Sequence, residues 1–194
     1  MLQLIQLSLP RLAPLELTVA PGQVLGLSGP SGSGKTRLLR ALADLDPHGG
    51  EICLDNTPQT AFPAHDWRRQ VMLVPAESQW WSDSVAEHFP ERRVVDWQAL
   101  GFDRDPSDWT IDRLSTGEKQ RLSLLRAMAY QPRVVLLDEP TANLDERSRA
   151  MVETWLLAAI RSHHKMAIWV SHDDRQLRRV ADQCLSLGPA SVSA

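Results

Sequence analysis

The chain has 194 residues, of which 43% are hydrophobic and 23% are charged, a composition typical of a folded globular domain. Its formal net charge of −3 argues against a general nucleic-acid-binding surface, and no run approaches the ~18 apolar residues that a membrane-spanning helix needs. Cys53 and Cys184 form no CxxC pair and so predict neither a disulfide nor a zinc site. We therefore expect one soluble domain over residues 1–194, in the cytoplasm.

Apolar alternation and short apolar runs predict the strands, and a 3.6-residue apolar period predicts the helices. The expected strands lie near residues 2–8, 13–19, 24–28, 51–54, 70–74, 134–138, 166–170 and 183–187. The expected helices lie near residues 35–44, 116–130, 146–162 and 174–181. The first two strands form a hairpin, and the later strands alternate with helices. This order predicts an α/β fold with an N-terminal antiparallel β element.

A phosphate-binding loop is predicted between the strand at 24–28 and the helix at 35–44. The loop sequence GPSGSGKT meets the pattern GxxxxGK[ST], in which glycines let successive amides point at phosphates and the following helix adds its positive dipole end. Lys35 is expected to reach the β and γ phosphates, and Thr36 to offer its hydroxyl to Mg²⁺. The predicted nucleotide-binding residues here are Gly29, Pro30, Ser31, Gly32, Ser33, Gly34, Lys35 and Thr36.

The run VVLLDE, residues 134–139, predicts the other side of the same site. Its apolar part is typical of a parallel strand buried on both faces, and it delivers Asp138 and Glu139 at the carboxyl end of that strand. In phosphate-loop ATPases the aspartate helps to hold Mg²⁺, and Glu139 is then placed to polarise an attacking water. Taken alone, the motif is equally compatible with an acidic strand end at a solvent edge.

Four motifs in this order resemble the ATP-binding subunit of an ABC transporter over nearly the whole chain. They are GPSGSGKT, LSTGEKQR from residue 114, VVLLDEPTANLD from residue 134, and SHD from residue 171. The resemblance implies a P-loop NTPase core of ABC ATPase type, with a short helical subdomain inserted at about residues 77–130 and with ATP and Mg²⁺ as cofactors. Details of the LSTGEKQR region also resemble small bacterial ATPases associated with metal export.

The same resemblance implies a dimer in which two copies pack head to tail, so that each copy caps the ATP held by the other. Ser115 and Gly117 would face the γ phosphate of the partner's ATP, and Asp145 would lie in the dimer-contact loop. His172 would contact the γ phosphate and order the attacking water, although a lone histidine after a strand is more often a surface or capping residue. Glu139, His172 and Lys35 are therefore the expected catalytic residues. The resemblance also implies a separate transmembrane permease, with the dimer at the cytosolic face of the cell membrane.

The sequence departs from the family pattern at the position of a glutamine that touches Mg²⁺ and senses the permease. The best register puts Ala76 there, and Glu77 or Gln79 could substitute if the loop shifts. In the LSGGQ-type motif, Thr116 and Glu118 replace a glycine and the glutamine, which leaves the serine and second glycine in place.

Another departure concerns the nucleobase, because residues 1–28 contain no Phe, Tyr, Trp or His to stack on adenine. Arg11 is the predicted platform, since a guanidinium can lie flat on a base. Weak discrimination between ATP and GTP is therefore expected.

Four tryptophans lie between residue 80 and the LSTGE motif. Trp97 and Trp109 are predicted to fill a small core, whereas at least one of the adjacent Trp80 and Trp81 is expected to face a partner.

Two other functions stay open at this point. A soluble ABC ATPase acting on nucleic-acid or protein complexes usually carries a coiled-coil insertion or two cassettes, and this sequence has neither. A regulatory subunit that hydrolyses weakly or not at all is disfavoured by Glu139 and His172. No nucleic-acid partner is expected.

Overall fold

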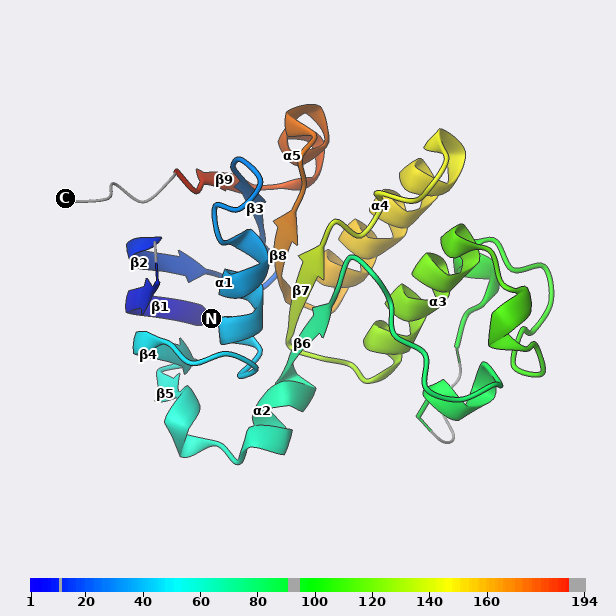
Figure 1. The fold of residues 1–194 in the computed structure, drawn as a ribbon, viewed down its shortest axis with the longest axis horizontal. Helices are drawn as coiled ribbons and strands as arrows, with labels where there is room; N and C mark the ends of the chain where they lie inside the picture. The colour runs from blue at the N-terminus through cyan, green and yellow to red at the C-terminus, as the bar shows by residue number, and fades with distance from the viewer. Residues whose placement is uncertain (11, 91–94, 189–194) are drawn as a thin grey trace.

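The computed structural model describes residues 1–10, 12–90 and 95–188, and it contains two sheets (Figure 1). In the antiparallel sheet the spatial order is β2-β1-β4-β5, from β2 (Leu12–Val19), β1 (Leu2–Leu9), β4 (Gly49–Leu54) and β5 (Thr57–Pro58). In the parallel sheet the order is β6-β7-β8-β3-β9, from β6 (Val71–Val74), β7 (Val134–Asp138), β8 (Met166–Val170), β3 (Val24–Ser28) and β9 (Gln183–Ser186). The predicted N-terminal antiparallel element and α/β core are both present.

The helices cover the parallel sheet on two faces. They are α1 (Lys35–Leu42), α2 (Ala64–Gln70), α3 (Thr116–Ala129), α4 (Glu146–Ser162) and α5 (Asp174–Val180). Helix α1 lies between the two sheets, and α3 and α4 lie on the other side of the parallel sheet (Figure 1).

The central strands divide their side chains between two hydrophobic cores. On β7, Val134 and Leu136 join the core shared with α1 and the antiparallel sheet, whereas Val135 and Leu137 join the core under α3 and α4. Successive strand residues point to opposite faces, so a parallel strand covered on both sides must be apolar throughout. This explains why the apolar run before Asp138 is continuous rather than alternating. It also places Asp138, and Glu139 directly after it, at the carboxyl end of β7.

The structure contains two elements that the sequence analysis did not predict. The segment 57–58 forms the short strand β5, and residues 64–70 form α2. The α2 sequence, AHDWRRQ, contains no apolar period because its one buried residue is Trp67, whose Nε1 donates to the carbonyl oxygen of Leu42 at 2.8 Å. A single buried aromatic anchors this helix, and such an anchor leaves no repeat in the sequence.

The described residues between β6 and α3 form three short 3₁₀ turns, at Ala86–His88, Gln98–Leu100 and Ile111–Arg113, and one isolated antiparallel bridge between Ser84 and Thr110. Its aromatic rings pack in pairs, with Phe89 on Trp97 at 4.8 Å and Phe102 on Trp109 at 6.1 Å between ring centroids. Trp97 and Trp109 are partly buried against the core under α3 and α4, which confirms the packing role predicted for them. The boundary of the helical subdomain, at about residues 77–130, stays a prediction.

Candidate active site

The phosphate loop joins the end of β3 to the start of α1 through a backbone that needs glycine. Gly29 has φ 139°, and a Cβ there would collide with the carbonyl oxygen of Leu187. Gly34 is the N-cap of α1 with φ 98°, and no side chain of the described residues caps the helix there. Within this part of the chain the first amides of α1 therefore have no side-chain acceptor at the cap, which is the arrangement that helix-terminal phosphate sites use.

Lys35 is held under this loop and is only 7% exposed. Its Nζ donates to the carbonyl oxygens of Gly29 at 2.8 Å and Pro30 at 3.0 Å. Ser33 lies on the same loop, and its Oγ is buried without a hydrogen-bond partner among the described residues. A buried hydroxyl of this kind needs a partner, and a phosphate oxygen fits it.

Thr36, in the first turn of α1, is hydrogen-bonded to Asp138, the last residue of β7. Thr36 Oγ1 donates to Asp138 Oδ2 at 2.8 Å, and Asp138 is 5% exposed at the end of β7. A hydroxyl and a carboxylate are oxygen ligands of the type that Mg²⁺ takes, together with substrate phosphates. The described residues contain no group of three or more His, Cys, Asp or Glu side chains that could hold a metal by themselves. The donor set therefore fits Mg²⁺ bound jointly with a nucleotide.

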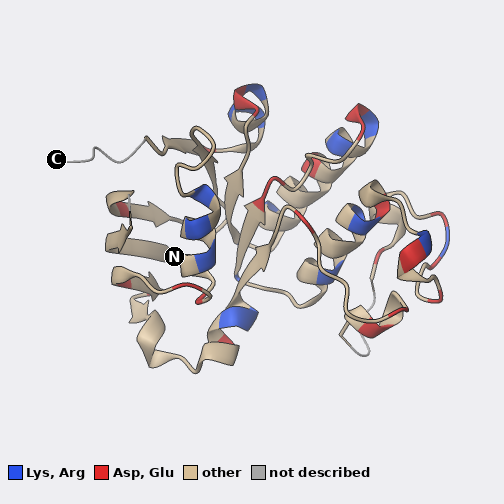
Figure 2. Cartoon of the chain, in the orientation of Figure 1, with Lys and Arg blue, Asp and Glu red and all other residues tan. Residues whose placement is uncertain are grey.

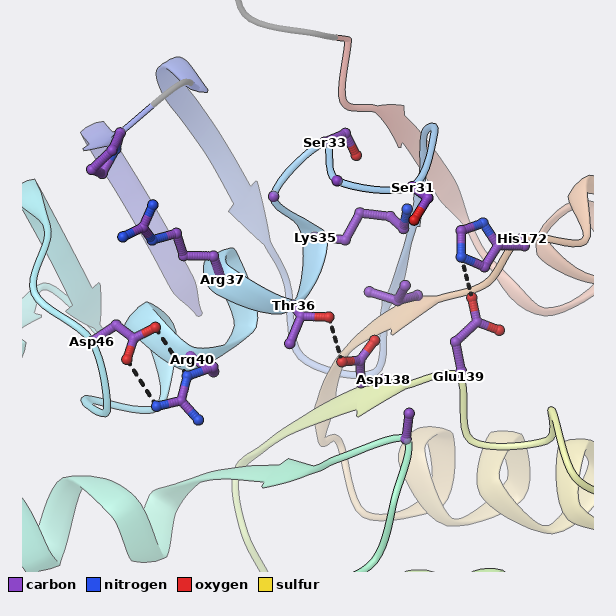
Figure 3. Close-up of a pocket in the computed structure, with 15 residues that line it drawn as sticks. Ser31, Ser33, Lys35, Thr36, Arg37, Arg40, Asp46, Asp138, Glu139 and His172 are labelled. Carbon is purple, nitrogen blue, oxygen red and sulfur yellow. Dashed lines mark hydrogen bonds and ion pairs between the residues drawn. The ribbon is translucent and has the colours of Figure 1, made fainter.

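Glu139 and His172 face one another next to this pair (Figure 3). His172 Nε2 lies 3.5 Å from Glu139 Oε1, and that oxygen is buried with no hydrogen-bond partner among the described residues. Burial raises the pKa of the Glu139 carboxyl, and the nearby Asp138 adds to the rise, while His172 and Lys35 oppose it. A carboxyl with a raised pKa and an unused oxygen is suited to accept a proton.

Most of the predicted site residues line one cavity of about 600 Å³ (Figure 3). The sequence-predicted residues that line it are Ser31, Gly32, Ser33, Gly34, Lys35, Thr36, Asp138, Glu139 and His172. Gly29 and Pro30 line a smaller neighbouring hollow that His172 also borders. Residues far apart in the sequence thus converge on one place, as the motif order predicted.

The far end of the cavity contains residues that the sequence analysis missed. Pro10, Arg37, Arg40 and Asp46 line it there. Arg40 is paired with Asp46 through two contacts of 2.9 Å, and no ion pair of Arg37 is present among the described residues. Basic residues recur along α1 (Figure 2), and their spacing after the phosphate loop is the signal that could have identified Arg37. Arg11, the predicted base platform, lies outside the described residues.

Ala76 lines the same cavity, in the position that the family register assigned to a glutamine. Glu77 and Gln79 are not among the described residues that line it. Gln79 turns its amide back to the carbonyl oxygen of Glu77 at 3.4 Å. The loop therefore presents a methyl group to the cavity rather than an amide.

The LSTGE motif begins α3 with a complete capping box. Ser115 Oγ accepts from the amide of Glu118 at 3.2 Å, and Glu118 Oε2 accepts from the amide of Ser115 at 2.9 Å. The Ser115 hydroxyl also donates to Glu118 Oε2 at 2.7 Å, and this bond, followed by the one from the Ser115 amide, lowers the pKa of Glu118. Glu118 thus takes over the N3 role of the family's glutamine, which explains how the substitution is accommodated.

Ser115, Gly117 and Asp145 are not among the described residues that line the cavity. Asp145 instead caps α4, accepting from the amide of Ser148 at 2.9 Å. The resemblance assigns these residues to contacts with a second copy of the chain and the ATP that it holds, so their roles stay predictions.

Comparison with known proteins identifies the family. Residues 12–142 match the family model described as ABC transporter. An aliphatic sulfonates import ATP-binding protein of Paraburkholderia xenovorans is 33% identical over 184 residues, which cover 93% of this chain and 72% of that protein. The chain belongs to the ABC transporter family.

Other relatives include a sulfate/thiosulfate import ATP-binding protein of Acinetobacter baylyi, 34% identical, and a putative 2-aminoethylphosphonate import ATP-binding protein of Salmonella choleraesuis, 35% identical. The matches cover 92% and 89% of this chain, which spans about half the length of these two relatives (55% and 50%). The solved structure of an ATP-binding subunit of an ABC transporter superposes with a TM-score of 0.85 at 20% identity, covering 96% of this chain and 85% of that one.

These comparisons confirm the predicted family and fold class, and they confirm the prediction of an ATP-binding, ATP-hydrolysing transporter subunit. The relatives named above are import proteins and do not bear on the resemblance to metal-export ATPases. Within the described residues, no helix has the length and apolar character needed to cross a membrane.

Proposed function

We propose that this ABC transporter subunit binds MgATP in the 600 Å³ cavity and hydrolyses it in a head-to-tail homodimer that drives a separate membrane permease. The observation that carries the proposal is the convergence on that cavity, from three separate parts of the sequence, of five residues: Lys35, Thr36, Asp138, Glu139 and His172. Each has the chemistry that one part of a phosphoryl transfer requires.

The proposed reaction is attack of a water on the γ phosphorus, with cleavage of the bond to the β-phosphate oxygen to give ADP and inorganic phosphate. Glu139 accepts the proton of the water through Oε1, which has no hydrogen-bond partner among the described residues. His172, 3.5 Å from that carboxylate, orients the water and the γ phosphate. Lys35 exchanges its loop carbonyls for phosphate oxygens, which stabilises the charge on the β and γ phosphates.

Thr36 and Asp138 would hold Mg²⁺, whose chemistry is to neutralise charge on the phosphate oxygens. Their existing 2.8 Å hydrogen bond shows that the two oxygens are already close enough to share one small ion.

The proposed dimer supplies what a single chain lacks, namely a second surface over the γ phosphate. Ser115 is the N-cap of α3 and Gly117 lies in the first turn of that helix, where the positive end of the helix dipole is located. Asp145 is the N-cap of α4 and accepts a hydrogen bond from the Ser148 amide, at the end of the segment that follows Glu139. Closing two copies head to tail would bring these groups onto the partner's ATP.

A permease contact is proposed for the surface around Trp81, which is 69% exposed. Arg126 lies 4.6 Å from the Trp80 ring centroid and 5.0 Å from that of Trp81, and no carboxylate pairs with it among the described residues. An exposed aromatic beside an unpaired cation is typical of a partner-binding surface. The dimer would then lie at the cytosolic face of the membrane, with the cargo set by the permease.

Two experiments test the proposal. Release of phosphate from ATP should require Mg²⁺ and should be lost in Glu139→Gln. Tagged Glu139→Gln, purified from detergent-solubilised host membranes with MgATP, should carry a multi-helix membrane protein in stoichiometric amount. Recovery of soluble partners alone would favour instead an ABC ATPase that works on nucleic-acid or protein complexes.

A further inference from the structure

The segment from Glu139 to Asp145 is short and carries both the proposed base and the proposed dimer-contact aspartate. Among the described residues, its internal backbone bonds are those from the Ala142 amide to the Glu139 carbonyl oxygen and from the Leu144 amide to the Thr141 carbonyl oxygen, both at 3.2 Å. The Glu139 amide also donates to the Val170 carbonyl oxygen at 3.2 Å, which ties the start of the segment to β8. Glu139 itself has φ 50°, a left-handed conformation that non-glycine residues adopt at a cost. Something outside the segment must therefore hold it.

Two buried glutamines from different helices contact the two residues that follow Glu139. Gln120 of α3 is 2% exposed, and its Nε2 donates to the Pro140 carbonyl oxygen at 3.2 Å. Gln176 of α5 is 3% exposed, and its Nε2 donates to Thr141 Oγ1 at 2.7 Å.

Gln176 is itself fixed from the other side. Its Nε2 also donates to Glu153 Oε1 at 2.7 Å, and Glu153 on α4 accepts Arg179 at 2.7 and 2.8 Å through both carboxylate oxygens. Thr141, Glu153 and Gln176 are all buried, so these bonds are shielded from water and strongly directional. Both hydrogens of the Gln176 amide are thereby used.

The helices involved each begin next to a proposed functional group. Helix α3 begins immediately after Ser115, α4 immediately after Asp145, and α5 two residues after His172. We infer that Gln120 and Gln176 are positioning residues that aim Glu139, by fixing the Pro140 and Thr141 positions to the helices that carry the other groups. This inference rests on the proposed role of Glu139 as the base.

If Gln176 only supports the fold, its substitution should lower stability without changing kcat. If it positions Glu139, the substitution should lower kcat. In Gln176→Leu and Thr141→Val, kcat for ATP should fall about tenfold, the change that about 1.4 kcal/mol in the barrier produces. The Kd for MgATP should change less than about twofold, because neither residue touches the phosphate loop. Trp67→Phe is the matched control, since it removes a buried side-chain bond of 2.8 Å to a backbone carbonyl far from the segment.

Exchanging the side chains of Gln176 and Glu153 tests whether the hydrogen bond between them can be restored in the opposite direction. Gln176→Glu places two carboxylates together and should impair turnover, whereas adding Glu153→Gln restores a donor and an acceptor between α4 and α5. The double variant should recover most of the kcat that Gln176→Glu loses.

Hydrogen exchange of peptides covering residues 139–145 gives a readout that does not depend on activity. Exchange there should be faster in Gln176→Leu than in the native chain, and unchanged in Trp67→Phe. If native protein shows no turnover, the proposed function fails in the isolated subunit, and the exchange result still decides whether Gln176 holds the segment. Unchanged exchange with unchanged kcat would overturn the inference, and so would a loss of MgATP affinity equal to the loss of kcat.

Discussion

Replacing Glu139 with glutamine should separate catalysis from folding. The substitution keeps the shape of the side chain but removes the carboxylate that we propose accepts a proton. General-base catalysis contributes about 10²–10⁴ in rate, which corresponds to about 3–5 kcal/mol in the barrier. Stability should change by under about 1 kcal/mol, because Glu139 Oε1 has no hydrogen-bond partner among the described residues and lies 3.5 Å from His172 Nε2. The predicted effect on turnover therefore far exceeds any effect of partial unfolding.

The raised pKa of Glu139 also predicts how the stability difference between Glu139→Gln and the native chain changes with pH. The folded-state pKa of Glu139 is raised, mainly by burial, above the ordinary value of 4.5. Such a group contributes stability below its unfolded pKa, and the contribution is lost as the pH rises through the folded pKa. Glutamine does not titrate, so the Tm of Glu139→Gln relative to the native chain should increase as the pH rises above about 4.5.

Phosphate release and nucleotide affinity are measured on the native chain, on Glu139→Gln and on Glu146→Gln, which alters an exposed glutamate at the start of α4. Thermal melts without nucleotide over a range of pH complete the set. Turnover in Glu139→Gln equal to that of the native chain would refute the base assignment. A Tm difference that decreases with rising pH would refute the electrostatic reasoning.

Four other predictions follow from the same geometry. Lys35→Ala should weaken MgATP binding by at least about tenfold in calorimetry, since it removes charge-assisted bonds worth about 1.5–3 kcal/mol each; unchanged affinity would contradict this. Ser115→Ala should lower stability by about 1 kcal/mol through loss of the helix cap, and it should abolish ATP-dependent dimers of Glu139→Gln in gel filtration. Native protein should bind ATP and GTP with similar affinity, and Arg37→Leu should weaken both in fluorescence titrations; a strong ATP preference would count against this. Trp81→Ala should leave the Tm nearly unchanged and abolish co-purification of the permease.

The sequence predicted the parts of the fold whose residues repeat or cluster. The bounds of β3, β7, β8 and α4 are those predicted, because continuous apolar runs and capped amphipathic helices leave direct patterns. Helix α2 and strand β5 were missed, since Trp67 alone anchors the helix and two residues are too few for any period.

The site was predictable as far as its motifs reach. Five residues, Lys35, Thr36, Asp138, Glu139 and His172, lie together on one cavity because each lies at or after the carboxyl end of a strand of the same parallel sheet. The pairing of Arg40 with Asp46 and the burial of Gln120 and Gln176 could not be predicted, because they depend on which helix faces pack together. Polar residues on helices are usually solvent-exposed, so nothing in the sequence marks these as buried.

Two neighbouring carboxylates at the end of β7 share one cavity, which a regular strand would not allow. Successive strand residues point to opposite faces, so an extended Glu139 would lie across the sheet from Asp138. The left-handed backbone at residue 139 breaks this alternation one residue after Asp138, the proposed metal ligand. For an L-residue such a conformation costs about 1–2 kcal/mol, a cost that glycine does not carry. A redesign guided by backbone preference alone would therefore choose glycine at this position, and would remove the very side chain for which the irregularity exists.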